Sequence, residues 1–253
     1  MATTRSSAGD PARTLGLLWR DPSAVPRRGP DRRLSVDAVV QTAIDIADRE
    51  GLRAVTMRRV ATDLGAGAMT LYTYVPSRSE LLDLMLDSVY AAIERRPATG
   101  TGWRARAEAI AEENRDLYLA HPWVCEVSTQ RPPLGPGQLA KYEHELAAFD
   151  GIGLTDVEMD DCLTYLLTFV QAWAHNTIAA RDARNDTGMT DEQWWAIAGP
   201  ELGRYVDPAS FPLASRVGEA AGAAHNSAHD PDHAFEFGLS RVLAGLEVMI
   251  TGD

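Results

Sequence analysis

The sequence predicts an all-α protein with a three-helix helix-turn-helix head and a larger helical body. Apolar residues recur at spacings of three and four along most of the chain, which is the spacing of one buried helix face. Capping residues stand where these periodic stretches begin and end. We find no strand-like alternation of apolar and polar residues of any length. A chain of 253 residues is long enough for one small and one larger core.

The first 33 residues are rich in Pro, Gly, Ser, Asp and Arg and lack periodicity, which predicts a disordered basic arm over 1–33. Residues 1–34 contain seven arginines against three aspartates, although the whole chain has a formal net charge of −12. Most of the excess acid lies beyond residue 100. The balance argues against a protein that coats nucleic acid, whereas a basic end on an acidic body is typical of a local DNA footprint.

A helix-turn-helix domain is expected over residues 34–80. Ser35 is placed to cap a first helix that Gly51 ends, and Thr56 to cap a second helix that Gly65 ends. The buried faces of these two helices are predicted from their spacing: Val36, Val39, Val40, Ala43, Ile44 and Ala47 in the first, and Val60, Ala61 and Leu64 in the second.

The third helix of the head is short and is expected over 68–74, with Leu71 and Val75 pointing inward. Pro76 ends it, because the residue before a proline is pushed out of the helical region. Ser77 and Glu80 then fit a capping box that opens a fourth, connecting helix.

The body is expected over 81–253 and is also helical. A long stretch over 156–184 is apolar on two faces, which indicates burial by its own core and by something else. Gly238 and Gly245 lie one heptad apart on the last helix and would let a partner helix approach closely. Pro208 and Pro212 predict irregular chain. The other expected helices span 103–119, 138–149, 191–204 and 234–250.

The head closely resembles the tetracycline-repressor (TetR) family of bacterial regulators. The similar residues are Ala43, Ala47 and Gly51 in the first helix, then 56–65 (TMRRVATDLG) and 70–81 (TLYTYVPSRSEL). The resemblance continues more weakly through 121–123 (HPW), 131–136 (RPPLGP) and 235–239 (FEFGL), which look like the C-terminal half of the tetracycline-repressor-like subgroup.

This resemblance implies a homodimer whose last two long helices pair with their symmetry mates in a four-helix bundle. The two heads would then reach successive major grooves of a double-stranded operator, roughly 34–36 Å apart. A small molecule that enters the body would change the head separation and release the operator, which is allostery between two distinct sites. The expected function is therefore a ligand-responsive repressor and not an enzyme.

Candidate DNA-contacting residues lie on the second and third helices. Arg58 is expected at a guanine edge or a phosphate, Met69 or a Thr methyl at thymine methyls, and Tyr72 at a phosphate. Alternatively, Arg58 and Arg59 are solvated surface side chains that do not contact DNA. Arg27 and Arg28 would enter the adjacent minor groove, or else the arm is a disordered tail without a DNA contact. The complete set is Arg27, Arg28, Thr56, Arg58, Arg59, Ala68, Met69, Thr70, Tyr72, Thr73, Tyr74 and Arg78.

The body supplies candidates for an effector site and for a dimer interface. Aromatic walls with a few polar groups are typical of small-molecule sites, although each residue alone is more often core or interface. The effector candidates are Trp103, Tyr118, Trp123, Tyr165, Phe169, Trp173, His175 and Asn176. The dimer candidates are Cys162, Tyr165, Gly238, Arg241, Val242, Gly245 and Met249.

Other classes of protein have little support in the sequence. No apolar run approaches a membrane span or a signal peptide, so a cytoplasmic protein is expected. Cys125 and Cys162 form no paired motif, and His225, His229 and His233 are expected in an exposed loop and not at a metal. No cofactor is expected. The alternative function is a helical enzyme or small-molecule carrier that retains the head as a structural module, but no catalytic pattern supports it.

Overall fold

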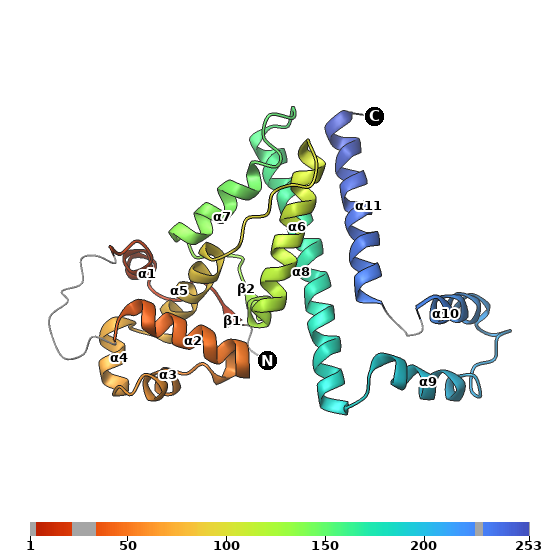
Figure 1. Cartoon of the computed structure of the whole chain (residues 1–253), viewed down its shortest axis with the longest axis horizontal. Coiled ribbons are helices and arrows are strands. Elements are labelled where there is room, and N and C mark those ends of the chain that lie inside the picture. Colours follow the sequence, from red (N-terminus) through yellow and green to blue (C-terminus); the bar gives the residue numbers. More distant parts are fainter. Residues whose placement is uncertain (1–3, 22–33, 226–229, 253) are drawn as a thin grey trace.

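The computed structural model describes residues 4–21, 34–225 and 230–252, and Figure 1 shows them as a helical head joined to a helical body. This arrangement confirms the predicted all-α fold, with one short two-stranded sheet in addition. Within these described ranges, no helix has both the length and the apolar character that a bilayer crossing requires.

The head contains α2 (Val36–Glu50), the 3-10 helix η2 (Leu52–Ala54), α3 (Met57–Asp63) and α4 (Ala68–Tyr74). The predicted caps are present, since Ser35 Oγ accepts from the Ala38 N–H and Thr56 Oγ1 accepts from the Arg59 N–H. Gly51 ends α2 with a φ of +80°, in the left-handed region that glycine enters without strain. These helices share one buried core with the connecting helix.

The connecting helix α5 (Arg78–Ala91) runs from the head into the body and is buried on most of its circumference. Its N-terminal half packs in the head core through Leu81, Leu82 and Met85. Unlike an ordinary core helix, α5 also buries three carboxyl groups, those of Glu80, Asp83 and Asp87. Elements on either side of α5 must therefore supply polar partners to it.

The body is built from α6 (Trp103–Ala120), α7 (Pro136–Leu146), α8 (Asp156–Thr187) and α11 (Pro231–Thr251). Thr155 and Glu158 form a capping box at the start of α8, and Gly188 ends it in the left-handed conformation. Helices α6, α8 and α11 pack side by side and enclose a second core. The predicted body helices are thus present, with bounds that shift by a few residues.

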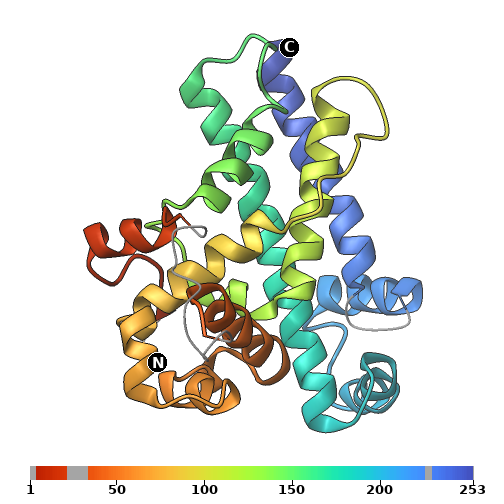
Figure 2. The same cartoon turned by 60° about the vertical axis from the view of Figure 1, so that its left-hand side comes forward.

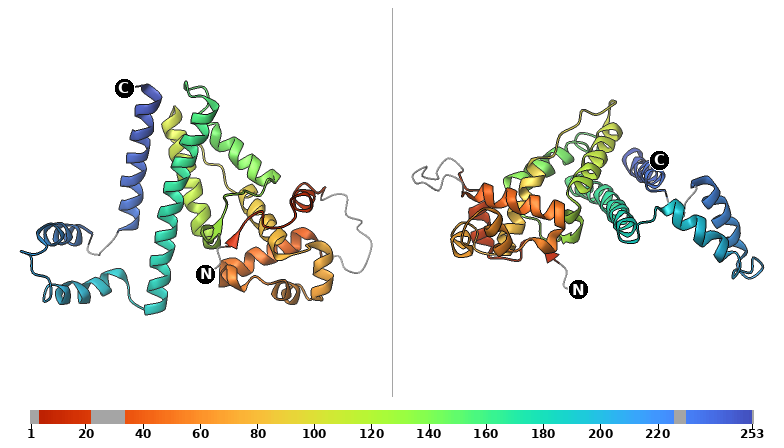
Figure 3. Two further views of the ribbon diagram at one scale, coloured as in Figure 1. Left: turned by 180° about the vertical axis from the view of Figure 1, so that it is seen from behind. Right: turned by 60° about the horizontal axis from the view of Figure 1, so that its bottom comes forward.

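Helices α9 (Asp191–Leu202) and α10 (Pro212–His225) form an arm that extends away from α8 and α11 (Figures 1 and 3). The expectation of irregular chain around Pro212 was wrong, because Pro212 begins α10 at a position where a helix tolerates proline. Neither helix buries a side chain fully within the described residues. The arm exposes large apolar side chains: Trp194, Ile197, Leu202, Tyr205, Phe211, Leu213 and Val217.

The N-terminal segment is ordered over residues 4–21, which corrects the prediction of a disordered arm. It contains β1 (Thr4–Arg5) and α1 (Pro11–Leu18), and α1 packs against α5 (Figure 2). Strand β1 pairs in parallel with β2 (Val127–Ser128), which follows the 3-10 helix η3 (Pro122–Glu126). Composition suggested disorder because most of the partners that order this segment lie more than 60 residues away in sequence, on α5 and in the segment 128–134.

Candidate DNA interface and effector site

The turn between α3 and α4 fixes how the two helices of the candidate DNA interface cross. Gly65 has a φ of +67°, as its predicted position at the end of the second helix requires. The Ala66 N–H donates to the Ala61 carbonyl at 2.8 Å and closes the turn. Gly67 caps α4 without a side-chain hydrogen bond. The two helices are held by their inner residues, which are buried: Met57, Val60, Ala61, Leu71 and Val75.

The opposite side of α3 and α4 presents exposed side chains on one surface. Met69 is 80% exposed and Tyr72 is 43% exposed, which are high values for side chains of this size. Arg58, Thr70 and Thr73 are exposed beside them, and Thr73 Oγ1 donates to the Thr70 carbonyl at 2.6 Å. This surface combines a cation, hydroxyl groups and an apolar tip, the mixture that reads phosphates and base edges in a major groove.

Two of the predicted DNA contacts lie partly inside the head. Ala68 and Tyr74 are half-buried and pack against the head core. They were predicted on the groove side because the short helix has few residues, and only Leu71 and Val75 indicate which face of it is buried. Their structural role is to seat α4, so any contact they make with DNA would use only part of each side chain.

Two of the predicted arginine contacts are engaged within the head. Arg59 forms an ion pair with Glu50 at 2.8 Å and another with Asp63 at 3.0 Å, which ties α3 to the end of α2. The Arg78 guanidinium donates to the carbonyls of Val55 and Leu52 at 2.9 and 3.0 Å. Both side chains therefore position the reading helices. The spacing of four residues between Arg59 and Asp63 could have indicated the first role, whereas no sequence signal indicates the second, because the partners of Arg78 are backbone atoms.

The predicted minor-groove residues Arg27 and Arg28 lie outside the described residues. Of the N-terminal arginines that are described, Arg20 forms an ion pair with Asp37 at the start of α2. This contact joins the N-terminal segment to the head.

The head is joined to the body at the other end of α2. One carboxylate, that of Asp48, accepts from the Trp123 indole N–H at 2.8 Å and lies 2.9 Å from His121 Nδ1. Trp123 is 1% exposed and has a structural role at the head–body junction, while its predicted place in the effector site stays a prediction. His175, on α8, lies across a cleft from this junction.

The predicted effector residues do not converge on one cavity. Phe169 and Trp173 of α8 pack on Phe235 of α11, with ring centroids 5.9 and 4.9 Å apart. The Arg115 guanidinium lies 4.9 Å from the centroid of the same Phe235 ring. This aromatic group joins α6, α8 and α11 inside the body. It brings together two of the eight candidates.

The other effector candidates are spread over the body. Trp103 packs on Phe149 near the start of α6, while Tyr118 lies near its end and contacts both cores. Tyr165 and the pair His175 and Asn176 are exposed on α8. Helix α8 is 32 residues long, and its neighbours change along its length, so spacing alone did not show which side each aromatic residue faces.

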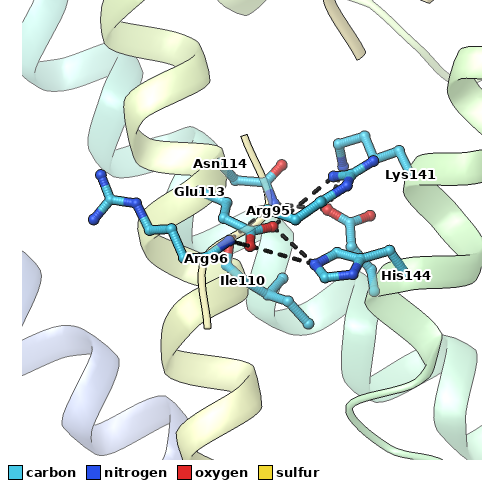
Figure 4. A network of polar contacts seen from close by, with 8 residues as sticks. Arg95, Arg96, Ile110, Glu113, Asn114, Lys141 and His144 are labelled. Atoms are coloured by element: carbon cyan, nitrogen blue, oxygen red, sulfur yellow. Dashed lines mark hydrogen bonds and ion pairs between the residues drawn. The ribbon is translucent and has the colours of Figure 1, made fainter. Parts of the chain in front are cut away.

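A buried polar network between α6 and α7 was missed by the sequence analysis (Figure 4). Glu145 accepts from Lys141 Nζ at 2.6 Å and from Asn114 Nδ2 at 2.7 Å. These three side chains are almost completely buried, and Asn114 Oδ1 has no hydrogen-bond partner. Lys141 Nζ also lies 5.6 Å from the centroid of the Tyr90 ring. The available signal was the chain's only lysine four residues before a glutamate on one helix.

The network continues through a second buried carboxylate, that of Glu113 on α6. Glu113 accepts from the Arg96 backbone N–H at 2.7 Å and lies 3.0 Å from His144 Nε2 (Figure 4). Close by, burial raises the pKa of the Tyr118 phenol and raises that of the Cys125 thiol to about 12. Both groups remain protonated at neutral pH, so Tyr118 can donate a hydrogen bond inside the body.

The dimer candidates divide into exposed and buried residues. Cys162 and Val242 are 1% and 7% exposed within the single chain, so their side chains pack mainly in the body core, and their place in a dimer interface stays a prediction. A Cβ atom on Gly238 would lie 2.3 Å from the Phe169 ring, which shows that this glycine accommodates α8 of its own chain. A Cβ atom on Gly245 would meet nothing within 4 Å. Tyr165, Arg241, Gly245 and Met249 are exposed.

The histidines near the start of α11 lie at a helix junction. His225 ends α10 and His233 lies in the first turn of α11, so the expectation of an exposed loop was wrong for these two residues, because Pro231 begins α11 at a position where a helix tolerates proline. The rings of His225 and His233 are 4.9 Å apart, and His229 lies outside the described residues.

Comparison with known proteins relates both the head and the body to transcriptional repressors. Residues 96–250 match the family model described as the tetracyclin repressor-like C-terminal domain. The chain is 41% identical over 250 residues to the HTH-type transcriptional repressor DrrR1 of Streptomyces coeruleorubidus, which covers 98% of this chain and 90% of that protein. It is 23% identical over 220 residues to the class E tetracycline repressor protein of Escherichia coli, covering 86% and 93% of the two chains.

Solved structures show the same arrangement of head and body. The TetR family protein ActR of Streptomyces coelicolor in complex with actinorhodin is 31% identical and superposes with a TM-score of 0.70, covering 87% of this chain and 97% of that chain. The complex of ActR with (S)-DNPA is 30% identical and superposes with a TM-score of 0.67, covering 85% and 98%.

Proposed function

The chain belongs to the tetracycline-repressor family of transcriptional regulators, and from this premise we propose that it is a homodimeric repressor that a small aromatic molecule releases from a palindromic operator. The proposal rests on the exposed surface that α3 and α4 form together. Helix α5 connects this part of the head to the body. As a regulator of transcription, the protein works in the compartment that holds the DNA.

The proposed reading surface consists of Arg58, Met69, Thr70, Tyr72 and Thr73. Helix α4 would enter the major groove with Met69 and Thr70 toward the base edges, because these residues lie in its first turn. Tyr72 and Arg58 would fix the orientation through phosphates or a guanine edge. Arg59 and Arg78 would contribute indirectly by holding α3, since their donor groups are engaged.

Selection of bound duplexes from a random DNA pool tests the proposal. An enriched palindrome with half-sites about one helical turn apart is expected, because two heads related by a two-fold axis read successive grooves. The selected operator should lose affinity steeply with salt. Absence of any enriched sequence at low salt would exclude a sequence-specific DNA reader.

Arg58→Ala is expected to weaken binding to the selected operator by about 5- to 100-fold, since one good base contact is worth about 1–3 kcal/mol. Fluorescence anisotropy with a labelled duplex would measure the change. Arg104→Ala removes the same charge near the start of α6, the end of this helix that points away from the head (Figure 1), and should leave affinity unchanged. Equal affinities of the two variants would remove Arg58 from the reading surface.

We place the effector site between the aromatic group and the polar network. Phe169, Trp173 and Phe235 supply flat apolar surfaces, while Asn114 supplies a buried oxygen without a partner. A planar aromatic compound that donates a hydrogen bond would satisfy both features. The complex of ActR with actinorhodin supports an aromatic effector for a relative of this fold. A thermal-shift screen of such compounds, followed by operator release, tests this assignment.

The proposed dimer would bury the exposed apolar residues of α8 and α11. Val157, Tyr165, Phe237, Val248 and Met249 are between 45% and 71% exposed, and a protein surface rarely leaves so many large apolar side chains in water without a partner. The exposed apolar residues of the α9–α10 arm extend this surface. Four long helices, two from each chain, would then form a bundle.

Gly245→Leu is expected to weaken the dimer without unfolding the chain. A Cβ atom added at Gly245 would meet nothing within 4 Å in the single chain, and leucine favours a helix over glycine by roughly 1 kcal/mol. In the dimer it would separate the two helices. Sedimentation velocity over a concentration series would show a shift to monomer, while circular dichroism stays helical. An unchanged dimer would place the interface elsewhere.

A further inference from the structure

The ordered N-terminal residues 4–21, here called the N-terminal clasp, contact three separate parts of the molecule. They bond to the chain between β2 and α7, they cover the buried carboxyls of α5, and they reach the start of α2 in the head. Figure 2 shows this segment lying across α5. A segment bonded to both the head and the body limits how far one can move relative to the other.

On the body side, the clasp is held by backbone carbonyls of the segment 128–134. Ser6 Oγ donates to the Arg131 carbonyl at 2.6 Å, and its N–H donates to the Ser128 carbonyl at 3.1 Å. The Trp19 indole N–H donates to the Leu134 carbonyl at 2.8 Å. Ser6 is 3% exposed, so its two bonds are partly shielded from water, whereas Trp19 is 55% exposed.

On the α5 side, the clasp supplies a partner to a buried carboxylate. Ser7 adopts a φ of +50°, rare for a residue other than glycine, and its backbone N–H donates to Asp83 Oδ1 at 2.7 Å. Gly9 lies directly against the Glu80 carboxylate, where a Cβ atom would come within 2.8 Å of Oε1. Without the clasp, both carboxyls would face water.

On the head side, the clasp is anchored by apolar burial and by one ion pair. Leu18 is 4% exposed and belongs to the head core. Arg20 pairs with Asp37, whose side chain is 64% exposed, so this pair contributes less than about 1 kcal/mol. The firm attachment to the head is therefore through Leu18 and α5.

We infer that the N-terminal clasp is a positioning element for DNA binding, which holds α5 and the head in one orientation relative to the body segment 127–135. Operator binding and effector release both require a defined head position, so the clasp shifts the balance between head orientations. This inference rests on the proposed function. The clasp acts through α5, against which α1 packs.

The first test loosens the clasp in the full chain. Ser6→Ala together with Trp19→Phe removes the side-chain bonds of Ser6 and Trp19 to the carbonyls of 128–134, and it keeps the β1–β2 pairing and the bond from Ser7 Oγ to the Pro132 carbonyl. Hydrogen exchange of residues 4–21 and 78–85 should become about tenfold faster, since two hydrogen bonds are lost, while α8 and α11 stay unchanged. Leu15→Gln, on the exposed side of α1, keeps these bonds and serves as the control.

The second test locks the clasp with a disulfide. Arg5 and Ser128 are Cα partners across the parallel strands, so Arg5→Cys with Ser128→Cys fits the geometry of a disulfide. The oxidised and reduced forms of this one protein are compared, which cancels the loss of the Arg5 charge. Ser128→Cys alone controls for pairing with Cys125. Peptide mapping identifies the bond that forms.

The expected result is that loosening and locking change the affinity for the selected operator in opposite directions, each by about threefold or more. If loosening and locking change the affinity in the same direction, the clasp is only a packed tail. The same conclusion follows if hydrogen exchange becomes faster in the clasp while exchange in α5 and operator affinity stay unchanged. The exchange measurements need no DNA. If wild-type protein selects no operator, the proposed function fails, while exchange in α5 still reports whether the clasp controls that helix.

Discussion

Glu145→Ala is expected to lower the free energy of unfolding by about 3–5 kcal/mol, which is the usual effect of removing one partner of a buried ion pair. Glu145 is 2% exposed and accepts from Lys141 and Asn114 at 2.6 and 2.7 Å. In the Glu145→Ala variant, the Lys141 ammonium, in a residue only 6% exposed, would have no carboxylate to which it can donate hydrogen bonds. Urea unfolding at pH 7.5, followed by circular dichroism, measures the loss.

Two variants separate the ion pair from the helix that carries it. Glu143→Ala, an exposed position on the same helix, should change stability by less than about 0.5 kcal/mol. Lys141→Met with Glu145→Leu replaces both charges by apolar groups and should restore most of the stability, because Asn114 Nδ2 still donates to the Ile110 carbonyl. A double variant as unstable as Glu145→Ala would show that volume, and not charge, determines the effect.

The same double variant connects the network to the proposed effector site. It removes the Lys141 and Glu145 charges but keeps Asn114, and it leaves α3 and α4 untouched, so operator binding should persist. If Glu145 holds Asn114 in position for the effector, release by a compound found with the wild-type protein should be lost. A variant that still responds normally would limit Lys141 and Glu145 to a structural role.

The head could be predicted from sequence because its determinants are local. Ser35 and Thr56 cap the helices that directly follow them, and Gly65 ends the second helix through its own backbone conformation. Leu71 and Val75 are 0% exposed, as their spacing indicated. Each of these signals lies within a few residues of the element that it controls, so no tertiary contact was needed to interpret it.

What could not be predicted depends on distant partners. The N-terminal segment has no apolar periodicity, and it is ordered by carbonyls and carboxyls that lie far along the chain. Arg78 was predicted to contact DNA because of its place in the motif. Its guanidinium instead donates to the carbonyls of Leu52, in η2, and of Val55, which follows η2. Composition and spacing do not indicate such contacts, because any exposed backbone carbonyl can accept them.

The effector site was the least predictable part of the molecule. Aromatic residues on α8 face the core, the cleft beside the head, or open surface, according to which helix lies opposite at each turn. Trp173 is buried beside Phe235, whereas Tyr165 is exposed on the same helix. The polar network could not be predicted because charged residues on a helix usually face water, and spacing does not show which of them are buried.

Asp83→Asn is expected to stabilise the protein by about 2–3 kcal/mol at pH 7.5, since a shift of one pKa unit corresponds to 1.36 kcal/mol. Asp83 is 0% exposed, and burial raises its pKa to about 6, with a further contribution from the neighbouring Glu80. At pH 7.5 the wild-type carboxylate is therefore ionised in an unfavourable place. Asparagine keeps an oxygen for the Ser7 N–H, and its amide can donate toward Glu80.

The dependence on pH follows from the direction of this shift. A raised folded-state pKa means that the folded protein holds the Asp83 proton more tightly than the unfolded chain does. In the wild-type protein, the contribution of Asp83 to the free energy of unfolding is thus fully favourable below about pH 4 and is lost as pH rises to about 6. The advantage of Asp83→Asn over wild type should be constant above pH 7 and should shrink toward zero near pH 4. Thermal unfolding across this range measures it, with the exposed Asp45→Asn as the control.

The outcome also bears on the clasp, because Asp83 is buried partly by Ser7 and the residues around it. If the clasp opened readily, Asp83 would be hydrated and its pKa would be ordinary, so the variant would gain nothing at any pH. A gain that disappears on acidification therefore requires a clasp that stays closed over α5. The same gain should fall in the Ser6→Ala, Trp19→Phe background, since loosening the clasp lets water reach the Asp83 carboxylate and reduces the unfavourable burial of its charge.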